Sequence, residues 1–412
     1  MNLVIAAISL VTAIKCGQLI DGVSDQPRTN AVIILEDERI TKVGGDEFLE
    51  TADKVIDLSN YTVLPGLIDA HVHPTIGCCN YQLDHLKKNS AAKALRGLKM
   101  VQDRLKAGWT TLRVAGSADT GFADLDIRRS IDSGEHIGPR IVGAGHYIST
   151  TGGGGDINNF SPEQNLIPDG CIADGVDEMQ KAVRNEIKNG ADWIKLLVTG
   201  AFMSAGDNPQ DVHFSIEELR ASVAEAHRRQ VPVMAHAHST EGIKQAVLAG
   251  VRSIEHGTFL DDEAIEMMVE NGTYLIPTIY LHEYFLKENA GEESQAKFNT
   301  LTKKYREHYL TFYRKAYQSG VKIGLGTDDV GFPSTFNAKE FACLIQIGMT
   351  SMQAIQAGTR VNAEMLQMSE IGTIEPGKYA DIIAVKQDPL KDISELERVR
   401  FVMLGGKVIK IE

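Results

Sequence analysis

The stretch PGLIDAHVH, residues 65–73, joins an apolar run to two histidines at positions i and i+2. Successive side chains of a β-strand point to opposite faces, so His71 and His73 are expected side by side on one face. Two neutral imidazoles at a strand end form half of a site for a divalent metal. An isolated His-x-His pair is more often structural, so this interpretation depends on further ligands at the ends of other strands.

The composition bounds the class of protein. The chain has 412 residues, of which 43% are hydrophobic and 24% charged, as is typical of soluble globular proteins. A formal net charge of -13 argues against nucleic acid or an anionic membrane as partner. Five scattered cysteines without a Cys-x-x-Cys pattern fit reduced thiols in a cytoplasmic protein. Residues 3–14 resemble the core of a signal peptide, but no Lys or Arg precedes them, so a signal remnant is kept as the alternative.

Both ends of the chain are rich in predicted short strands and contain no predicted helix. The N-terminal strands are expected at 11–16, 18–21, 30–35, 39–43 and 54–58, and the C-terminal ones at 380–386, 401–404 and 407–411. Neither set is large enough to bury a core alone. We therefore expect residues 1–63 and 369–412 to form one small β-sandwich together.

Residues 64–368 alternate between strand and helix patterns. Strands are predicted at 63–68, 110–114, 140–145, 193–198, 231–235, 252–255, 274–278 and 322–326. Helices are predicted at 90–107, 126–133, 176–189, 215–229, 240–249, 261–270, 294–319, 337–348 and 351–366. Eight such strands over about 300 residues predict an α/β fold, a (β/α)₈ TIM barrel. A doubly wound open sheet is the alternative, although no Gly-x-Gly-x-x-Gly follows the first strand.

Ionisable side chains occur at the ends of several predicted strands, where the active sites of such barrels lie. They are His71, His73, His146, Lys195, His236, His238, Glu255, His256, Asp328 and Asp329. Any one of them is more often structural, but their number at corresponding strand ends points to a site. Lys195 is costly to bury when charged. It is expected either in an ion pair or as a carbamate that bridges two metals, and the neighbouring histidines favour the carbamate.

Several motifs resemble those of the amidohydrolase superfamily, within it the group related to imidazolonepropionases that holds metal-dependent dipeptidases and carboxypeptidases. The resemblance covers nearly the whole chain from about Ala13. It is carried by PGLIDAHVH at 65–73, Lys195, AHAH at 235–238, SIEHG at 253–257, GTD at 326–328 and GTIEPGKYAD at 372–381. Imidazolonepropionases themselves use a single metal without a carboxylated lysine, so they fit Lys195 less well.

The resemblance implies two Zn²⁺ ions per chain, bridged by N6-carboxylated Lys195 and a hydroxide. By position, His71, His73 and Asp328 hold one ion, and His236 and His256 hold the other. The hydroxide attacks the scissile carbonyl. Asp328 accepts its proton and delivers it to the leaving amine, because an amide nitrogen leaves poorly until it is protonated.

The glycine-rich run TTGGGGD, residues 150–156, follows the third strand. It is not a phosphate-binding P-loop, since no Gly-Lys-Ser/Thr comes after it. It is either a surface loop or a loop at the barrel mouth that meets a substrate carboxylate. Related dipeptidases often have Thr-Gly-Gly-His where this chain has Gly154, which removes one expected substrate contact. The candidate substrate-binding residues are His146, His238, Thr151, Gly152 and Gly153.

The expected function is hydrolysis of the amide bond to the C-terminal residue of a dipeptide or similar N-acyl amino acid, foremost an Xaa-Pro dipeptide. One alternative is a carboxypeptidase for C-terminal Arg or Lys, with Asp156, Asp207 or Asp211 in its pocket. Others are hydrolysis of an N-acyl amino acid, a toxin amide or a cyclic amide. A non-catalytic barrel that binds a small molecule is disfavoured, because every metal position and Asp328 are present. A homo-oligomer is expected.

Overall fold

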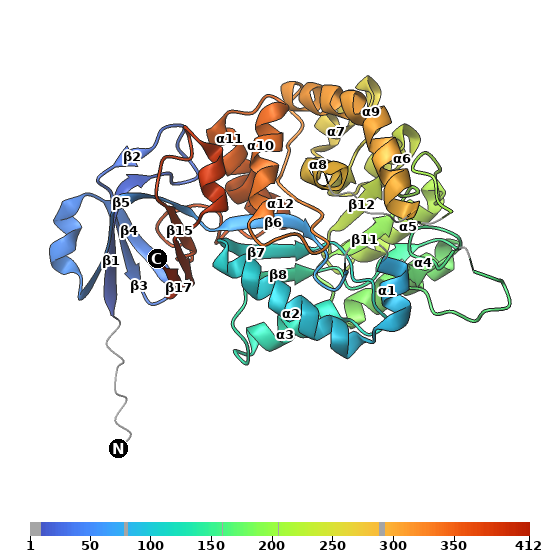
Figure 1. Ribbon diagram of the computed structural model, residues 1–412, viewed down its shortest axis with the longest axis horizontal. Coiled ribbons are helices and arrows are strands. Elements are labelled where there is room, and N and C mark those ends of the chain that lie inside the picture. Colours follow the sequence, from blue (N-terminus) through green and yellow to red (C-terminus); the bar gives the residue numbers. More distant parts are fainter. Residues whose placement is uncertain (1–9, 78–80, 159, 205, 288–292) are drawn as a thin grey trace, which may run out of the picture.

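The computed structural model describes residues 10–77, 81–158, 160–204, 206–287 and 293–412 (Figure 1). The apolar segment at the N-terminus therefore lies largely outside the described residues, as do Cys78 and Cys79. None of the helices in these ranges has the length and apolarity needed to cross a membrane. Figure 1 shows a β-rich part beside a larger part in which helices surround strands.

The β-rich part is one eight-stranded sheet to which both chain ends contribute. Figure 1 shows the N-terminal strands in blue and the C-terminal ones in dark red side by side. Its order is β17-β16-β15-β5-β1-β3-β4, with β2 paired to β1. The strands are β1 (Val11–Leu19), β2 (Arg28–Thr29), β3 (Val32–Glu36), β4 (Arg39–Gly44), β5 (Lys54–Pro65), β15 (Ile382–Val385), β16 (Phe401–Leu404) and β17 (Lys407–Ile411).

Two features of this sheet were not part of the sequence prediction. Its strands form a single hydrogen-bonded sheet, because β5 pairs with β1 from Lys54 to Val63 and with β15 from Thr62 to Pro65. The N-terminal segment, expected to be free of helix, also contains a 3-10 helix, η1 (Asp46–Thr51). The sheet buries a core of its own that includes Ile14, Ile33, Ile382 and Phe401.

The larger part is built on parallel strands, which confirms the α/β class. One sheet contains β6 (Leu67–Val72), β7 (Trp109–Val114) and β8 (Arg140–Gly143). The other has the order β10-β9-β11-β12-β13-β14. Its strands are β9 (Tyr147–Ser149), β10 (Cys171–Ile172), β11 (Ile194–Leu197), β12 (Val233–Ala237), β13 (Ser253–His256) and β14 (Tyr274–Ile276).

Backbone hydrogen bonds connect these two sheets at both edges. The amide of Trp193, just before β11, donates to the carbonyl of Gly143 at the end of β8. On the other side, Ile323 forms a parallel bridge with Leu275 of β14, and the amide of Ala70 in β6 donates to the carbonyl of Leu325. The segment predicted as the eighth strand, 322–326, thus lies between β14 and β6, joined by single bridges rather than a continuous ladder.

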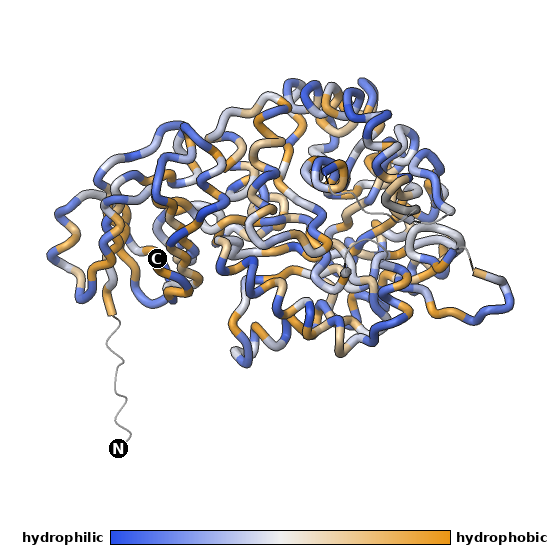
Figure 2. The backbone as a smooth tube through the Cα atoms, in the orientation of Figure 1, coloured by the Kyte–Doolittle hydropathy of each residue, from blue (hydrophilic) through white to orange (hydrophobic). Residues whose placement is uncertain are grey.

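Helices connect the parallel strands, and several of them begin at capping residues. Asn89 accepts a hydrogen bond from the amide of Ala92 at the start of α2, and Ser215 forms a capping box with Glu218 at the start of α5. Figure 2 shows hydrophobic segments along the strands and many hydrophilic ones on the outer helices. The helices are α1 (Tyr81–Lys87), α2 (Ser90–Lys106), α3 (Ala123–Asp132), α4 (Val176–Lys188), α5 (Ile216–His227), α6 (Thr240–Ala249), α7 (Asp262–Asn271), α8 (Ile279–Lys287), α9 (Glu293–Gln318), α10 (Lys339–Gln346), α11 (Ser351–Gln356) and α12 (Asn362–Leu366).

Two helices, α1 and α8, were not expected from the sequence pattern. The predicted helix 351–366 is divided by a π-helical segment, Ala357–Val361. Short 3-10 helices also occur at Phe336–Ala338 and Ile393–Glu397. α8 follows β14 directly, so its first turns lie at the same end of the strands as the predicted site.

Candidate active site

Ionisable side chains from five strand positions line one cavity of about 110 Å³. They come from β6, β11, β12, β13 and the segment after 322–326, at the carboxyl ends of the parallel strands. All six predicted metal ligands and one predicted substrate-binding histidine are among them: His71, His73, Lys195, His236, His238, His256 and Asp328. The structure therefore brings together residues separated by more than 250 positions in the sequence.

His71 and His73 present their Nε2 atoms to Asp328. The Oδ1 atom of Asp328 lies 3.6 Å from Nε2 of His71 and 3.2 Å from Nε2 of His73. The Nδ1 atoms face away, since that of His71 lies 2.6 Å from Glu255 and that of His73 lies 2.7 Å from the carbonyl of Gly116. Such contacts orient the rings and leave Nε2 for a ligand in the cavity.

Asp69, within the PGLIDAHVH stretch, holds the two segments together. Its Oδ1 accepts hydrogen bonds from the backbone amides of His71 and Thr327, both at 3.1 Å. Its Oδ2 accepts from the Thr327 hydroxyl at 2.7 Å and from the Asn337 amide at 2.8 Å. One buried carboxylate thus aligns the end of β6 with the segment that carries Asp328.

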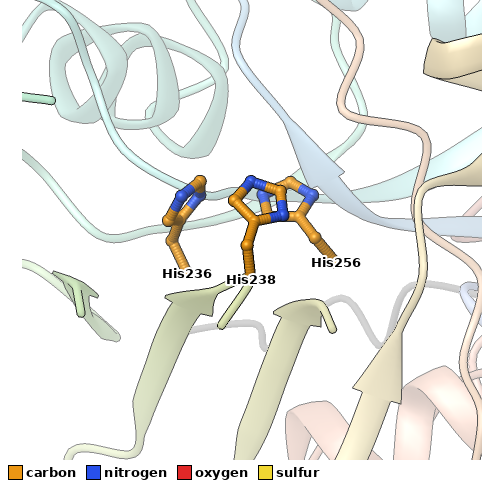
Figure 3. Close-up of side chains that lie close together, drawn as sticks. All are labelled: His236, His238 and His256. Carbon is orange, nitrogen blue, oxygen red and sulfur yellow. The ribbon is translucent and has the colours of Figure 1, made fainter. Parts of the chain in front are cut away.

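His236, His238 and His256 form a second group (Figure 3). Their rings project together from the ends of β12 and β13, with centroids 4.5 to 4.9 Å apart. One nitrogen from each lies within 4.8 Å of the others, and in the group His71, His256 and Asp328 one nitrogen of each histidine and one carboxylate oxygen lie equally close together. Since His256 belongs to both groups, the two could hold neighbouring metal ions. His238, predicted as a substrate contact, lies among the candidate ligands.

Three non-glycine residues at this end of the strands have left-handed backbone conformations. Their φ angles are 71° at His256, 49° at Thr278 and 53° at Asp328. Each such conformation costs roughly 1–3 kcal/mol and persists only where the surrounding structure imposes it. His256 and Asp328 are candidate ligands, and Thr278 contacts Nδ1 of His256 at 2.8 Å. The strain therefore coincides with the site.

Burial shifts the pKa values of the candidate ligands toward the protonation states that bind a metal ion. It lowers the pKa of Lys195 to about 8, so its amine is far easier to deprotonate than that of an exposed lysine. Burial, together with the charge of Lys195, lowers the pKa of His71 to about 4 and that of His236 to about 3. Burial alone would raise the pKa of Asp328, but His71 and His73 bring it below its ordinary value. Neutral imidazoles beside an ionised carboxylate are a donor set that fits divalent metal ions.

A fully buried ion pair contacts the Nδ1 side of His71, away from the cavity. Nη2 of Arg113 lies 2.8 Å from both carboxylate oxygens of Glu255, and neither side chain is exposed. Burial alone would raise the pKa of Glu255, but the charge of Arg113 and the bond from His71 lower it. The ionised carboxylate keeps the His71 proton on Nδ1 and its lone pair on Nε2. The sequence motif contained Glu255 but did not indicate this role.

The predicted substrate contacts His146, Thr151, Gly152 and Gly153 do not line the cavity. Nδ1 of His146 lies 3.2 Å from Glu186, and the Thr151 hydroxyl donates to Asp174. The amide of Gly152 donates to Asp156, and that of Gly153 donates to the carbonyl of Thr150. The two glycine amides thus stabilise the turn of the loop itself, whereas His146 and Thr151 contact Glu186 and Asp174 outside it.

The rest of the cavity lining forms a mostly apolar wall. It includes Ile76, Leu197, Ala201, Phe202, Met203, Leu281, Phe298 and Val330, together with Gly154 and the polar residues Tyr81, Tyr147, Ser204 and His282. Within the described lining, Lys195 is the only Lys or Arg. Apart from Gly154, the sequence reasoning did not single out these residues, although the position of His282 shortly after the seventh strand could have indicated it.

The model of the amidohydrolase family matches residues 62–409, and the chain belongs to this family. It is thus a hydrolase that acts on small molecules, as the sequence motifs indicated. The ochratoxinase of Aspergillus niger is 34% identical over 429 residues, which cover 97% of this chain and 87% of that protein. The imidazolonepropionase of Cutibacterium acnes is 25% identical and covers 86% of this chain and 84% of that protein.

Solved structures of similar proteins extend the comparison. A Xaa-Pro dipeptidase with methionine bound in its active site has a TM-score of 0.89 and 37% identity, covering 97% of this chain and 100% of that chain. A prolidase in complex with N-methylphosphonate-L-proline has a TM-score of 0.87 and 30% identity, covering 98% and 100%. The likeness extends through both the sheet of the chain ends and the parallel strands.

Proposed function

We propose that this amidohydrolase cleaves the amide bond to the C-terminal residue of a dipeptide, foremost an Xaa-Pro dipeptide. The observation that carries the proposal is the convergence of the six candidate metal ligands, among them buried Lys195 and ionised Asp328, on one cavity with an apolar wall. The similarity to a Xaa-Pro dipeptidase and a prolidase supports the substrate class.

The fold that holds this site is proposed to be a closed (β/α)₈ barrel. In a doubly wound open sheet, the outer strands would have a free edge. Here β6 pairs with β7 on one side and bonds to Leu325 on the other, and β8 bonds to the residues just before β11. These contacts support closure, and closure explains why the strand ends converge on one cavity.

Two zinc ions would be held by the ligands that converge on the cavity. His71, His73 and Asp328 would hold one ion, and His236 and His256 the other, with carboxylated Lys195 between them. A metal pair bound there would polarise the scissile carbonyl and lower the pKa of the attacking water. Lys195 can accept CO₂ only as a neutral amine, and its lowered pKa makes that form accessible near neutral pH.

Asp328 is proposed to move the proton during hydrolysis. Its Oδ1 atom lies close to Nε2 of both His71 and His73, and the side chain lines the cavity. Because its pKa lies below the ordinary value, it is ionised and ready to take a proton from the attacking water. It then gives that proton to the amide nitrogen, which leaves as the free amine. The apolar wall limits the water that competes for these groups.

The cavity lining favours an uncharged leaving residue over Arg or Lys. A carboxypeptidase for cationic residues needs a carboxylate in the pocket, yet Asp156, Asp207 and Asp211 are not among the residues that line the cavity. Asp156 accepts from the amide of Gly152, and Asp207 lies 3.2 Å from Nε2 of His213. Hydrolysis of a different N-acyl amino acid is the second candidate, favoured by the 34% identity to ochratoxinase across 97% of the chain.

A substrate screen tests the proposal. Zinc-loaded protein would be assayed against Xaa-Pro dipeptides, dipeptides that end in Arg or Lys, and other N-acyl amino acids. We expect the highest kcat/KM for Xaa-Pro dipeptides with an apolar first residue. Higher values for other N-acyl amino acids would favour the second candidate. Cleavage only of dipeptides with a cationic C-terminal residue would refute the proposed Xaa-Pro dipeptidase activity.

A further inference from the structure

Nearly all polar side chains on the apolar wall of the cavity are satisfied by the protein itself. The hydroxyls of Tyr81 and Ser204 lie 2.7 Å apart, and that of Tyr81 also donates to the carbonyl of Gly154 at 2.8 Å. The Tyr147 hydroxyl donates to Asp169 at 2.5 Å. These groups therefore have no need of a ligand to complete their hydrogen bonds.

His282 on α8 is the exception. Its ring lines the cavity and is only 2% exposed. Nδ1 lies 2.9 Å from the hydroxyl of Thr302 on α9. The ring stacks on Phe298 and Tyr309, with centroids 5.1 and 5.0 Å away, and stands nearly perpendicular to Phe202 at 5.5 Å. Its orientation is thus fixed, while Nε2 has no hydrogen-bond partner among the described residues.

The partner of Nδ1 determines where the imidazole proton lies. The Thr302 hydroxyl is fully buried, and His282 is its only hydrogen-bond partner in the described part of the chain. A buried hydroxyl without another acceptor donates its proton, so Nδ1 accepts. A neutral imidazole that accepts at Nδ1 carries its proton on Nε2. An N–H donor at an aromatic wall is costly unless a ligand supplies an acceptor.

We propose that His282 is a specificity-determining residue whose Nε2–H donates to an acceptor oxygen of the substrate. The proposal rests on the proposed function, because it assumes that the amide substrate occupies this cavity. The substrate then combines an apolar group against Phe202 and Phe298 with one oxygen within reach of His282. Two oxygens could serve, the C-terminal carboxylate of the leaving residue or a carbonyl on the acyl side.

His282→Phe tests this assignment, since it keeps the aromatic stacking and removes the donor. It would be compared with wild type on Met-Pro, Met-prolinamide and Met-pyrrolidide, which differ only in the C-terminal group. We expect kcat/KM for Met-Pro to fall about tenfold through KM, with kcat nearly unchanged, because the donor binds a part of the substrate that does not react. His282→Gln, which restores a donor, should recover part of the loss.

His308→Phe is the matched control, because His308 is exposed on α9 and lies outside the cavity lining. It should leave all three substrates unchanged, and thermal unfolding would verify that each variant folds. A loss by His282→Phe on Met-Pro and Met-prolinamide but not on Met-pyrrolidide would identify the C-terminal group as the acceptor. An equal loss on all three would place the acceptor on the acyl side. No loss on any substrate would overturn the proposal.

Failure of the proposed function and failure of the His282 assignment give different results. Wild-type protein that cleaves none of these compounds would refute dipeptide hydrolysis. Calorimetric binding of L-methionine, whose carboxylate is an acceptor, would still test His282. The dissociation constant should then rise about tenfold in His282→Phe and remain unchanged in His308→Phe. Equal constants in all three proteins would overturn the assignment.

Discussion

Glu255→Gln removes one charge from the buried network behind His71 and nearly conserves the volume. The carboxylate of Glu255 accepts from Arg113, from Nδ1 of His71 and from the Ser253 hydroxyl at 2.5 Å. A glutamine offers only one acceptor oxygen, and its NH₂ group would face one of these donors. Arg113 would then remain charged and fully buried without a counter-ion.

This geometry predicts the size of two losses in Glu255→Gln, one in the free energy of unfolding and one in metal affinity. Breaking a buried ion pair by removing one partner costs about 3–5 kcal/mol in the free energy of unfolding. Loss of the carboxylate that orients a metal-binding histidine weakens metal affinity roughly 10- to 100-fold. The double variant that carries both Arg113→Met and Glu255→Met has neither charge. Its free energy of unfolding should therefore be higher than that of Glu255→Gln alone.

Urea unfolding of metal-free protein would give the first quantity, and metal titration with a competing chelator the second. Asp262→Asn serves as the control, because Asp262 and Lys315 form an ion pair of 2.5 Å whose side chains are 64% and 50% exposed. It should change the free energy of unfolding by less than about 1 kcal/mol. If Glu255→Gln were as mild as this control and bound metal normally, the reasoning about the network would be refuted.

Three further predictions concern other buried groups. Lys195→Ala should lose bound metal and activity together, and a short carboxylic acid should restore part of both; metal content near that of wild type would contradict the bridging role. Asp328→Asn should keep most of its metal but lose about 100-fold or more in kcat, measured with metal content confirmed. Burial raises the pKa of Asp124 to about 7, so the folded state keeps a proton that the unfolded chain releases near pH 4. The free energy of unfolding should therefore fall between about pH 4 and 7, and Asp124→Asn should flatten this dependence in urea unfolding at pH 5 and 8.

The sequence by itself determined the parallel strands and the residues that carry the chemistry. The pattern at 65–73 depends on strand alternation alone, which is a property of neighbouring residues. The same holds for His236 and His238 and for the lysine within the apolar strand at 193–198. Because carboxyl ends of parallel strands meet at one face, these positions were expected to converge, and they line one cavity.

Only the tertiary structure decided which residues orient the candidate ligands and which residues form the apolar wall of the cavity. Glu255 contacts His71 across 184 positions, and Thr302 on α9 orients His282 across 20. The sequence could not show that the amides of Gly152 and Gly153 donate within the glycine-rich loop, or that the Thr151 hydroxyl donates to Asp174. Such pairings depend on how distant segments pack, because a donor can bond only to the acceptors that the fold brings near it. Local periodicity contains no information about that choice.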